Sequence, residues 1–283
     1  MLQANQIDPI VKLALREDVG SKDITTSCII PPNMRIKADI EFKQPGVLCG
    51  LEIAERVFRL IDENLRFLPV ARDGERIEKN REVAYIEGSA ASVLIAERTA
   101  LNFLGHLSGI ATRTREFVDK VKNTRANILD TRKTTPGLRL FEKYAVATGG
   151  AMNHRMGLYD QALIKDNHLR ILRKQSITST VSGLKNGILR RTIAGIEVKN
   201  LSELKEAFKT SVDYILLDNM KVETVREAVN MRKRLGSRIY FEASGGITID
   251  NVLEYAQTGV ERISVGALTH NAPSIDVSLD IVA

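Results

Sequence analysis

The chain between residues 214 and 246 reads Tyr214-Ile215-Leu216-Leu217-Asp218, then a helical pattern from Val222 to Leu235, then Ile239-Tyr240-Phe241-Glu242-Ala243-Ser244-Gly245-Gly246. A short apolar run without polar alternation is typical of a parallel strand that is buried on both faces. A helical pattern between two such runs is typical of the crossover that joins parallel strands. This segment therefore predicts parallel strands covered by helices.

The same alternation of strand and helix extends over the second half of the chain. Further short apolar runs lie at 128–129, 162–164, 193–196 and 263–265, and helical patterns lie at 201–208 and 248–258. With the two runs quoted above, these segments predict six strands, which favour an α/β barrel or partial barrel.

The first ninety residues have a different pattern. Residues 36–42 alternate apolar and polar side chains, as a half-buried antiparallel strand does, and shorter strands are predicted at 47–49, 66–70 and 82–86. Helices are predicted at 7–18, 51–61 and 92–122, with Gly105 and Gly109 leaving open a division of the last one into two helices.

The tail, residues 276–281, alternates like the strands of the first domain, so we expect it to return to that sheet. The sequence thus predicts an α+β sandwich domain over residues 1–107, completed by 271–283, and an α/β barrel domain over residues 108–270.

The charge balance favours an anionic partner. The 283-residue chain has 41 Lys and Arg against 35 Asp and Glu, no Trp, 5% aromatic residues and no long basic run. Binders of single-stranded nucleic acid usually combine a basic groove with aromatic stacking platforms, so no nucleic-acid partner is expected. A small, multiply charged substrate matches this composition better.

The two cysteines, Cys28 and Cys49, form no Cys-x-x-Cys motif and have no nearby histidine, so no zinc site is predicted. Two buried free thiols in a reducing compartment are the default, with a disulfide left open. The N-terminus lacks the apolar core of a signal peptide, and no apolar run reaches membrane-spanning length. We therefore expect a soluble, cytoplasmic protein without membrane contact.

Cationic residues gather between residues 129 and 168. Arg132-Lys133, His154-Arg155 and Lys165 lie beside turn residues rather than at helical spacing. A solvated helix face would mix charges of both signs four residues apart. One basic loop pair commonly serves only solubility, but three such groups in one stretch favour an anionic ligand.

Polar or flexible residues end each predicted strand of the barrel: Asp130, Lys165, Glu197, Asp218, Glu242 and Gly266. In βα barrels the catalytic groups lie at this carboxyl end, and the last two loops usually hold phosphate. The last two turns here are Ser244-Gly245-Gly246 and Ser264-Val265-Gly266-Ala267, where glycine lets backbone N–H groups approach phosphate oxygens.

Glu197 and Asp218, without a cysteine or histidine cluster, suit Mg²⁺, which prefers oxygen ligands and substrate phosphates. The cations suit a carboxylated partner. Together these features indicate the transfer of a phosphorylated sugar to a polycarboxylate, with diphosphate as the leaving group.

Motifs distributed over nearly the whole chain carry a resemblance to one known family. They are Glu17-Asp18-Val19-Gly20, Glu97-Arg98-Thr99-Ala100-Leu101-Asn102, Asp130-Thr131-Arg132-Lys133-Thr134-Thr135-Pro136-Gly137, Asn153-His154-Arg155, Leu163-Ile164-Lys165-Asp166-Asn167-His168, Leu217-Asp218-Asn219-Met220, Glu242-Ala243-Ser244-Gly245-Gly246 and Ser264-Val265-Gly266-Ala267-Leu268-Thr269-His270. Together they closely resemble the nicotinate-nucleotide pyrophosphorylases, also called quinolinate phosphoribosyltransferases.

The resemblance implies an α/β sandwich domain followed by an open, seven-stranded α/β barrel. It implies that quinolinate and phosphoribosyl pyrophosphate are converted with Mg²⁺ to nicotinate mononucleotide, carbon dioxide and diphosphate, in NAD biosynthesis. It also implies a homodimer in which Arg98 of one subunit enters the barrel mouth of the other; further assembly into hexamers stays open.

The resemblance also implies roles for individual residues. The quinolinate carboxylates would be held by Arg98, Arg132, His154, Arg155 and Lys165. The phosphoribosyl donor and its metal would be held by Lys133, Glu197, Asp218 and the two glycine turns, namely Ser244, Gly245, Gly246, Val265, Gly266 and Ala267, with Thr131 also binding substrate. Glu197 and Asp218 would hold Mg²⁺ directly or through substrate or water, and Lys133, Lys165, Glu197 and Asp218 form the predicted catalytic set.

The chain departs from the family pattern at Lys22 and Ala151, where glycine is usual, and at Phe141 and Phe241, where leucine is usual. Ala151 bears most directly on function because it neighbours His154-Arg155.

The molybdenum-transport-associated paralogue is the nearest rival, and the intact Lys165-Asp166-Asn167-His168 motif favours quinolinate over it. A Schiff-base aldolase using Lys165 or Lys133 is a second rival, and a nucleic-acid-binding protein a third.

Overall fold

The structure is a computed structural model that describes residues 2–282. By spatial contacts it forms two compact units: Met1–Arg115, Thr134–Gly150 and Leu268–Ala283 make the first, and Glu116–Lys133 and Ala151–Ala267 make the second. The domain boundary that we predict between residues 107 and 108 concerns which segments fold as one domain, and it stays a prediction. None of the described helices is both long enough and apolar enough to cross a membrane.

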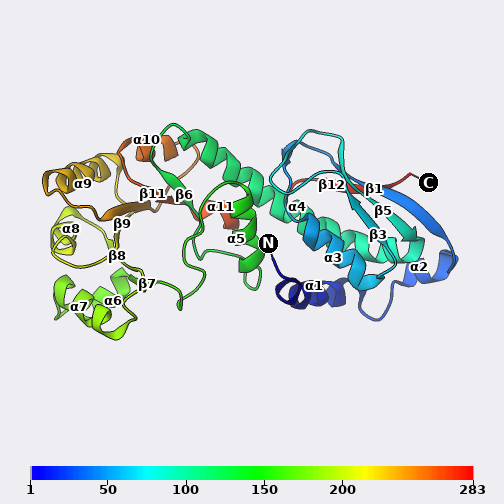
Figure 1. Cartoon of the computed structure of the whole chain (residues 1–283), viewed down its shortest axis with the longest axis horizontal. Coiled ribbons are helices and arrows are strands. Elements are labelled where there is room, and N and C mark those ends of the chain that lie inside the picture. The colour runs from blue at the N-terminus through cyan, green and yellow to red at the C-terminus, as the bar shows by residue number, and fades with distance from the viewer. Residues whose placement is uncertain (1, 283) are drawn as a thin grey trace. The chain divides into compact units, whose positions relative to one another are not determined.

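The first unit contains a four-stranded antiparallel sheet in the order β12-β1-β5-β3 (Figure 1). Its strands are β1 (Arg35–Phe42), β3 (Arg66–Pro69), β5 (Arg81–Ser89) and β12 (Val277–Ile281). The pairing of β12 with β1 runs from Ala38 opposite Ile281 to Phe42 opposite Val277. The expected return of the tail to the first sheet is therefore confirmed.

Helices and a short strand pair complete the first unit. They are α1 (Ala4–Val19), α2 (Ile24–Ile29), α3 (Leu51–Ile61), most of α4 (Ala90–Val121) and α5 (Arg139–Thr148), with β2 (Gly46–Val47) paired to β4 (Arg76–Ile77). The apolar periodicity placed α1, α3 and α4 within a few residues of these bounds.

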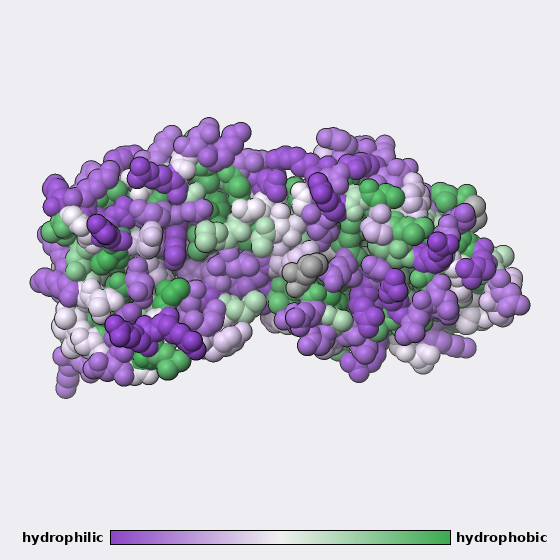
Figure 2. All heavy atoms as spheres, viewed as in Figure 1, coloured by the Kyte–Doolittle hydropathy of each residue, from purple (hydrophilic) through white to green (hydrophobic). Residues whose placement is uncertain are grey.

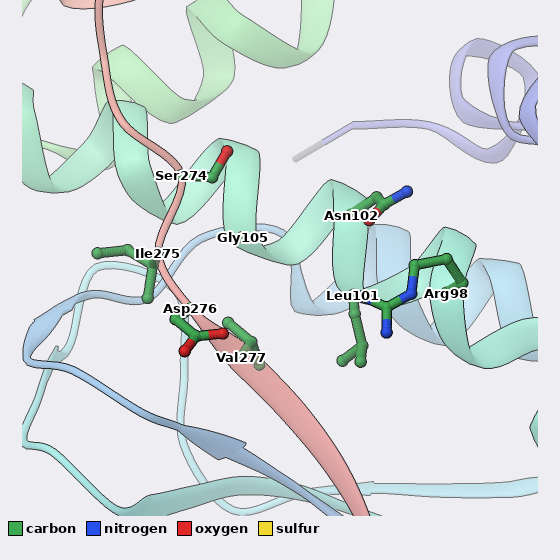
Figure 3. A pocket seen from close by; sticks show the side chains of 8 residues that line it. All are labelled: Arg98, Leu101, Asn102, Gly105, Ser274, Ile275, Asp276 and Val277. Carbon is green, nitrogen blue, oxygen red and sulfur yellow. The ribbon is translucent and has the colours of Figure 1, made fainter.

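Gly105 and Gly109 do not divide α4, which is one continuous helix. A Cβ atom on Gly105 would lie 2.7 Å from the carbonyl oxygen of Ile275, and one on Gly109 would lie 2.1 Å from that of Pro273. Figure 3 shows the chain at Ser274 and Ile275 passing next to Gly105. These glycines are needed for the close approach of the tail, and the helix tolerates them because its other positions are well packed.

The second unit contains a six-stranded parallel sheet in the order β6-β11-β10-β9-β8-β7. Its strands are β6 (Asn127–Leu129), β7 (Ala162–Ile164), β8 (Ala194–Val198), β9 (Tyr214–Asp218), β10 (Tyr240–Ser244) and β11 (Arg262–Ser264). All six predicted runs are strands. The resemblance implies seven strands, whereas within residues 2–282 this sheet has six, with one isolated parallel bridge between Leu129 and Met152; β6 and β7 are the two ends of the sheet. The predicted fold class, a sandwich domain and an open α/β barrel, is confirmed.

Helices α6 (Asp166–Ile171), α7 (Ile177–Gly187), α8 (Leu201–Ala207), α9 (Val222–Arg234) and α10 (Val252–Gln257) lie around these strands, and α11 (Ala267–His270) follows β11 (Figure 1). The strands are short and almost fully buried; every residue of β8 is buried. Figure 2 shows hydrophilic side chains over much of the visible face of each unit. The amphipathic helices therefore cover the apolar strands, as the patterns predicted.

One face of the parallel sheet carries the polar residues that matter below. Gly195 is paired with Tyr214 and Glu197 with Leu216, while Glu242 of the next strand is also paired with Leu216. Paired residues share a face and side chains alternate along each strand. Glu197, Asp218 and Glu242 therefore all lie on the same face.

Gly195 makes room on this face for the ring of Tyr214. A Cβ atom at residue 195 would lie 2.2 Å from the ring, and Tyr214 is only 1% exposed. Replacing Gly195 by Ala should lower the free energy of unfolding by about 1–3 kcal/mol. The added methyl group would overlap the Tyr214 ring, and the packed core leaves the ring little room to shift. Urea unfolding followed by circular dichroism measures this loss.

Gly183→Ala is the matched control because no atom lies within 4 Å of the added Cβ in the middle of α7. It should raise stability by up to about 1 kcal/mol through helix propensity. Equal effects of the two substitutions would contradict the packing of Tyr214 over Gly195.

Candidate active site

The carboxyl ends of the parallel strands gather most of the predicted site residues in the second unit. Because all strands of this sheet point the same way, the residues that end them or follow them lie along one edge. The structure brings to this edge Thr131, Arg132, Lys133, Lys165, Glu197, Asp218, Ser244, Gly245, Gly246, Val265, Gly266 and Ala267.

Glu197 and Asp218 form a carboxylate pair on adjacent strands. Glu197 is 6% exposed, and Lys165 donates a hydrogen bond to its Oε2 over 3.2 Å. Burial, followed by the negative charge of Glu197, raises the pKa of Asp218, while Lys199 and Lys165 partly offset this. The two carboxylates repel each other, so a cation between them would be stabilised.

The donor set fits a magnesium ion that is shared with a substrate. Mg²⁺ is usually bound by one or two carboxylates together with phosphate oxygens and waters, and the pair Glu197 and Asp218 offers two. Within residues 2–282, the one group of three close acidic or other metal-binding side chains is Asp39, Glu41 and Asp280, on the sheet of the first unit. The carboxyl edge therefore suits Mg²⁺ with bound diphosphate better than a metal held by protein alone.

The segment after β7 builds the start of α6 and thereby places Lys165. The backbone N–H of Lys165 donates to Nδ1 of His168 over 2.9 Å, which caps the first turn of the helix. Asp166 accepts a hydrogen bond from Nζ of Lys199 at 2.6 Å. The motif at residues 165–168 is thus a local framework that fixes the backbone from which Lys165 reaches Glu197.

Arg132 and Arg155 bring two positive charges together at this edge. Arg155 is 6% exposed, and its Nη1 donates to the carbonyl oxygen of Gln161 over 3.1 Å. Burial, and then the charge of Arg132, lowers the pKa of Arg155 below its ordinary value. An anion bound between two such cations would relieve their repulsion, and guanidinium groups match carboxylates particularly well.

His154 lies at the same edge, but its ring faces the protein interior. Its side chain is 7% exposed, its Nδ1 accepts the backbone N–H of Arg155 over 2.7 Å, and its Nε2 lies 3.2 Å from Oε1 of Glu242. Its own backbone N–H donates to Oδ1 of the fully buried Asp130 over 2.7 Å. The loop is therefore tied to the buried Asp130 by a hydrogen bond, and the His154 ring faces the buried carboxylate of Glu242.

The predicted site set did not include Glu242. Its carboxylate is fully buried and accepts a hydrogen bond from Oγ of Ser264 over 2.6 Å as well as facing His154. The available signal was a glutamate inside the otherwise apolar run 239–244, because a charge at a buried strand position needs partners. The partners themselves come from distant parts of the chain and could not be read from the sequence.

The turn after β10 is shaped by residues with positive φ angles. Gly245 and Gly246 have φ angles of +93° and +64°, and Asn219 has a φ of +54° and donates its N–H to the carbonyl oxygen of Ser244 over 2.7 Å. A Cβ atom on Gly245 would lie 2.9 Å from the Asn219 backbone. Glycine is thus required at residue 245 both for its φ angle and for this contact.

The second glycine turn differs from the first. Val265 is 1% exposed, and its N–H donates to the carbonyl oxygen of Leu129 over 2.9 Å. Its backbone amide is therefore already used within the sheet. Ala151 also causes no strain: among the described residues the non-glycine positions with positive φ are Asn80 and Asn219. The backbone at residue 151 thus accepts alanine.

Arg98 is the predicted site residue that the structure does not place in the second unit. It lies on α4 with its side chain 62% exposed and its Nη2 3.8 Å from Oε1 of Glu97. Figure 3 shows it at a small pocket of about 220 Å³ in the first unit, together with Asn102, Ser274 and Asp276. Its cross-subunit role stays a prediction.

Comparison with known proteins finds members of one family that match nearly the whole chain. The family model described as quinolinate phosphoribosyl transferase, N-terminal domain, matches residues 23–108, and the C-terminal domain model matches residues 110–280. The probable nicotinate-nucleotide pyrophosphorylase [carboxylating] of Synechocystis is 40% identical over 98% of this chain and 92% of that protein. The quinolinate phosphoribosyltransferase [decarboxylating] 2a of Nicotiana tabacum is 38% identical over 96% and 81%.

Solved structures agree with these sequence matches. The nicotinate-nucleotide pyrophosphorylase of Francisella tularensis superposes with a TM-score of 0.93 at 35% identity, covering 100% of this chain and 98% of that one. A structure from Streptococcus pyogenes gives a TM-score of 0.94 at 38% identity, covering 100% and 99%. The sandwich domain and the open barrel are thus both present in these relatives.

The raised pKa of Asp218 predicts a stability cost at neutral pH. Because folding disfavours its ionised form, the cost is absent below the ordinary carboxyl pKa of 3.8 and grows as pH rises through the raised value. Asp218→Asn should therefore be more stable than the unsubstituted protein at pH 7.5, without ligands, with the difference vanishing below pH 3.8. Urea unfolding at both pH values tests this.

Asp250→Asn serves as the control, since Asp250 is exposed and its substitution should change stability little at either pH. A less stable Asp218→Asn protein at pH 7.5 would contradict the repulsion between Asp218 and Glu197.

Proposed function

The chain belongs to the quinolinate phosphoribosyl transferase family, and on that premise we propose that it converts quinolinate and phosphoribosyl pyrophosphate to nicotinate mononucleotide, carbon dioxide and diphosphate, a step of NAD biosynthesis. The observation that carries the proposal is the single sheet edge on which a cationic group and a carboxylate pair lie together. The cations match a dicarboxylic acid, and the carboxylates match a metal-bound diphosphate.

The quinolinate site would be formed by Arg132, Arg155 and Lys165. In support, Arg132 and Arg155 repel each other in the free protein, which a bound dicarboxylate would reverse. Lys165 is oriented by its contact with Glu197 and by the capped start of α6. Arg98 of a second subunit would add a further cation, and His154 belongs to the same predicted set.

The phosphoribosyl donor would lie against Lys133, the carboxylate pair and the glycine turns. Glu197 and Asp218 would hold Mg²⁺, directly or through substrate or water, and the remaining contacts would come from Thr131, Lys133, Ser244, Gly245, Gly246, Val265, Gly266 and Ala267. When bound, the ion neutralises charge on the leaving diphosphate. The Val265 amide is bonded to the carbonyl oxygen of Leu129, so it is already used within the sheet rather than for a phosphate.

The chemistry needs orientation and charge rather than a covalent enzyme intermediate. Release of diphosphate breaks the C–O bond of the ribose carbon, and the pyridine nitrogen of quinolinate then donates its electron pair to that carbon. The cationic ring nitrogen stabilises the electron pair left on the ring when the adjacent carboxylate departs as carbon dioxide. Lys133 would supply the proton that this ring carbon then takes up.

A Schiff-base mechanism gains no support at Lys165. Its Nζ lies 3.2 Å from Oε2 of the buried Glu197, so in the free protein this nitrogen already has a carboxylate partner. The chain would act in the cytoplasm as a homodimer.

Incubation of the protein with quinolinate, phosphoribosyl pyrophosphate and Mg²⁺ should consume quinolinate and release carbon dioxide and diphosphate in equal amounts. Omission of Mg²⁺ should reduce the rate at least about 100-fold, because a metal offsets several kcal/mol of charge in such transfers. Loss of quinolinate is followed by its ultraviolet absorbance and by chromatography. A protein that leaves quinolinate unchanged with Mg²⁺ present would refute the proposed function.

The shared site predicts complementation between two inactive variants. Arg98→Ala and Lys165→Ala should each lose activity, and a refolded mixture should regain up to about a quarter of the unsubstituted activity, because half of the dimers then carry one intact site. Mixtures of either variant with itself are the control. No recovery in proven heterodimers would show that Arg98 does not act across the interface.

A further inference from the structure

The loop that follows β6 carries the predicted site residues 131–133, and its backbone is anchored on both sides of them. On the β6 side, the N–H of Asp130 donates to the carbonyl oxygen of Met152 over 3.2 Å. On the α5 side, the N–H of Thr135 donates to Oε2 of Glu142 over 3.2 Å. The freedom of the loop is therefore limited to the short segment between these two anchors.

Glu142, in the first turn of α5, is fully buried and has a partner for each carboxylate oxygen. Oε2 accepts the Thr135 N–H, and Oε1 lies 3.1 Å from Nε2 of His106 on α4. A carboxylate only accepts hydrogen bonds, so in the ionised pair the ring nitrogen donates. Loss of either contact would leave a buried carboxylate oxygen without its partner, which is costly, so the two contacts support each other.

The start of α5 holds the loop by a second contact. Nε of Arg139 donates to Oγ1 of Thr134 over 3.0 Å, next to the anchored Thr135. The N–H of Leu138 donates to the carbonyl oxygen of Thr135 over 3.1 Å and closes the turn that leads into the helix. The end of the loop is thus a fixed turn, which Glu142 holds from the protein interior.

His106 connects this anchor to α4. Its own side chain is 27% exposed, but Leu104 and Leu107 beside it in the helix are fully buried, so the backbone of α4 is fixed at this point. The contacts from His106 to Glu142 and from Glu142 to Thr135 all lie within the first unit. The loop is therefore held by a helix whose position does not depend on bound substrate.

Arg132 and Lys133 gain from this anchor because both are exposed and carry adjacent like charges. Ordering two long cationic side chains and the loop beneath them costs conformational entropy. A loop that is fixed before the substrates arrive lowers this cost at the binding step. It also keeps the two charges within the narrow distance range that binding and catalysis require.

We propose that Glu142 and His106 are positioning residues for the substrate-binding loop. His106 holds the carboxylate of Glu142, Glu142 holds the backbone at Thr135, and the loop thereby presents Arg132 and Lys133 to the substrates. Neither Glu142 nor His106 touches a substrate. The inference rests on the proposed function, which identifies these substrates as quinolinate and phosphoribosyl pyrophosphate.

The test measures the KM for both substrates, which does not depend on the fraction of enzyme that is folded, in two variants of Glu142. Glu142→Leu keeps the approximate size of the side chain and removes both acceptors, so both KM values should rise about tenfold, the effect of losing a hydrogen bond to a charged group. Glu142→Gln should restore both values to within about threefold of the unsubstituted protein, because its oxygen can accept from Thr135 while its amide donates to Nε2 of a neutral His106 ring.

Hydrogen exchange followed by mass spectrometry tests the anchor without any substrate. Peptides that cover residues 131–138 should exchange at least about tenfold faster in Glu142→Leu, because the Thr135 N–H has lost its acceptor. Peptides from the parallel strands should exchange as in the unsubstituted protein. Unchanged exchange in the loop would show that Glu142 does not hold it and would overturn the inference.

A double-mutant cycle tests whether His106 acts through Glu142. His106→Ala should raise both KM values severalfold by itself and change them less than about twofold in the Glu142→Leu background. Fully additive effects would overturn the role of His106. If Glu142→Leu fails to fold, His106→Ala takes its place, since this side chain is partly exposed; unchanged KM values and loop exchange in it would then refute the inference.

Tyr144→Phe is the matched control on the same helix. The Tyr144 hydroxyl donates to Oδ2 of Asp73 over 2.7 Å, so its loss also removes a hydrogen bond between α5 and a carboxylate, but none to the loop. This variant should be less stable, with both KM values and the loop exchange unchanged. A rise in KM equal to that of Glu142→Leu would show that any weakening of α5 has this effect, and would count against positioning by Glu142.

The two proposals fail in different ways. Unsubstituted protein that leaves quinolinate unchanged would refute the proposed function, and the exchange rates would still decide whether Glu142 holds the loop. Active unsubstituted protein, with normal KM values in folded Glu142→Leu, would refute the positioning role alone.

Discussion

The register of the parallel sheet is the constraint on which the rest of the structure depends. Glu197 and Glu242 are both paired with Leu216, so the strands β8, β9 and β10 present their carboxylates to one face. A shift of one residue in any of these strands would turn its polar side chains to the opposite face. The packing of Tyr214 over Gly195 opposes such a shift, because a side chain at residue 195 would overlap the ring. Core packing and site geometry are thus determined by the same contacts.

The site concentrates like charges that the fold alone would not favour. The pKa of Asp218 is raised by burial and by the charge of Glu197, and the pKa of Arg155 is lowered by burial and by the charge of Arg132. The two like charges of each pair repel each other in the free protein. An ion of opposite charge that binds between them removes this repulsion, and the free energy so gained favours binding. The buried carboxylate of Asp130 accepts the backbone N–H of His154 and so holds the loop that carries Arg155 against this repulsion.

The elements themselves were predictable because their signals are local. All six apolar runs are strands, and the tail at 276–281 joins the first sheet. Two predictions needed the tertiary structure to be decided. Gly105 and Gly109 leave α4 intact because they admit the tail of the chain, and the described part of the parallel sheet has six strands and one bridge at Met152, where the resemblance implies seven strands. In both cases the deciding contact joins residues that are far apart in the sequence.

The sequence by itself determined the two-domain α/β architecture, the family and most residues of the carboxyl edge, since periodicity and strand-end chemistry are properties of short segments. Only the tertiary structure decided how those residues are used. It turned the ring of His154 inward, gave Glu242 its partners, and showed the amide of Val265 bonded to Leu129. The physical reason is that hydrogen-bond partners and charge repulsion depend on distances between strands, and a linear sequence does not contain those distances.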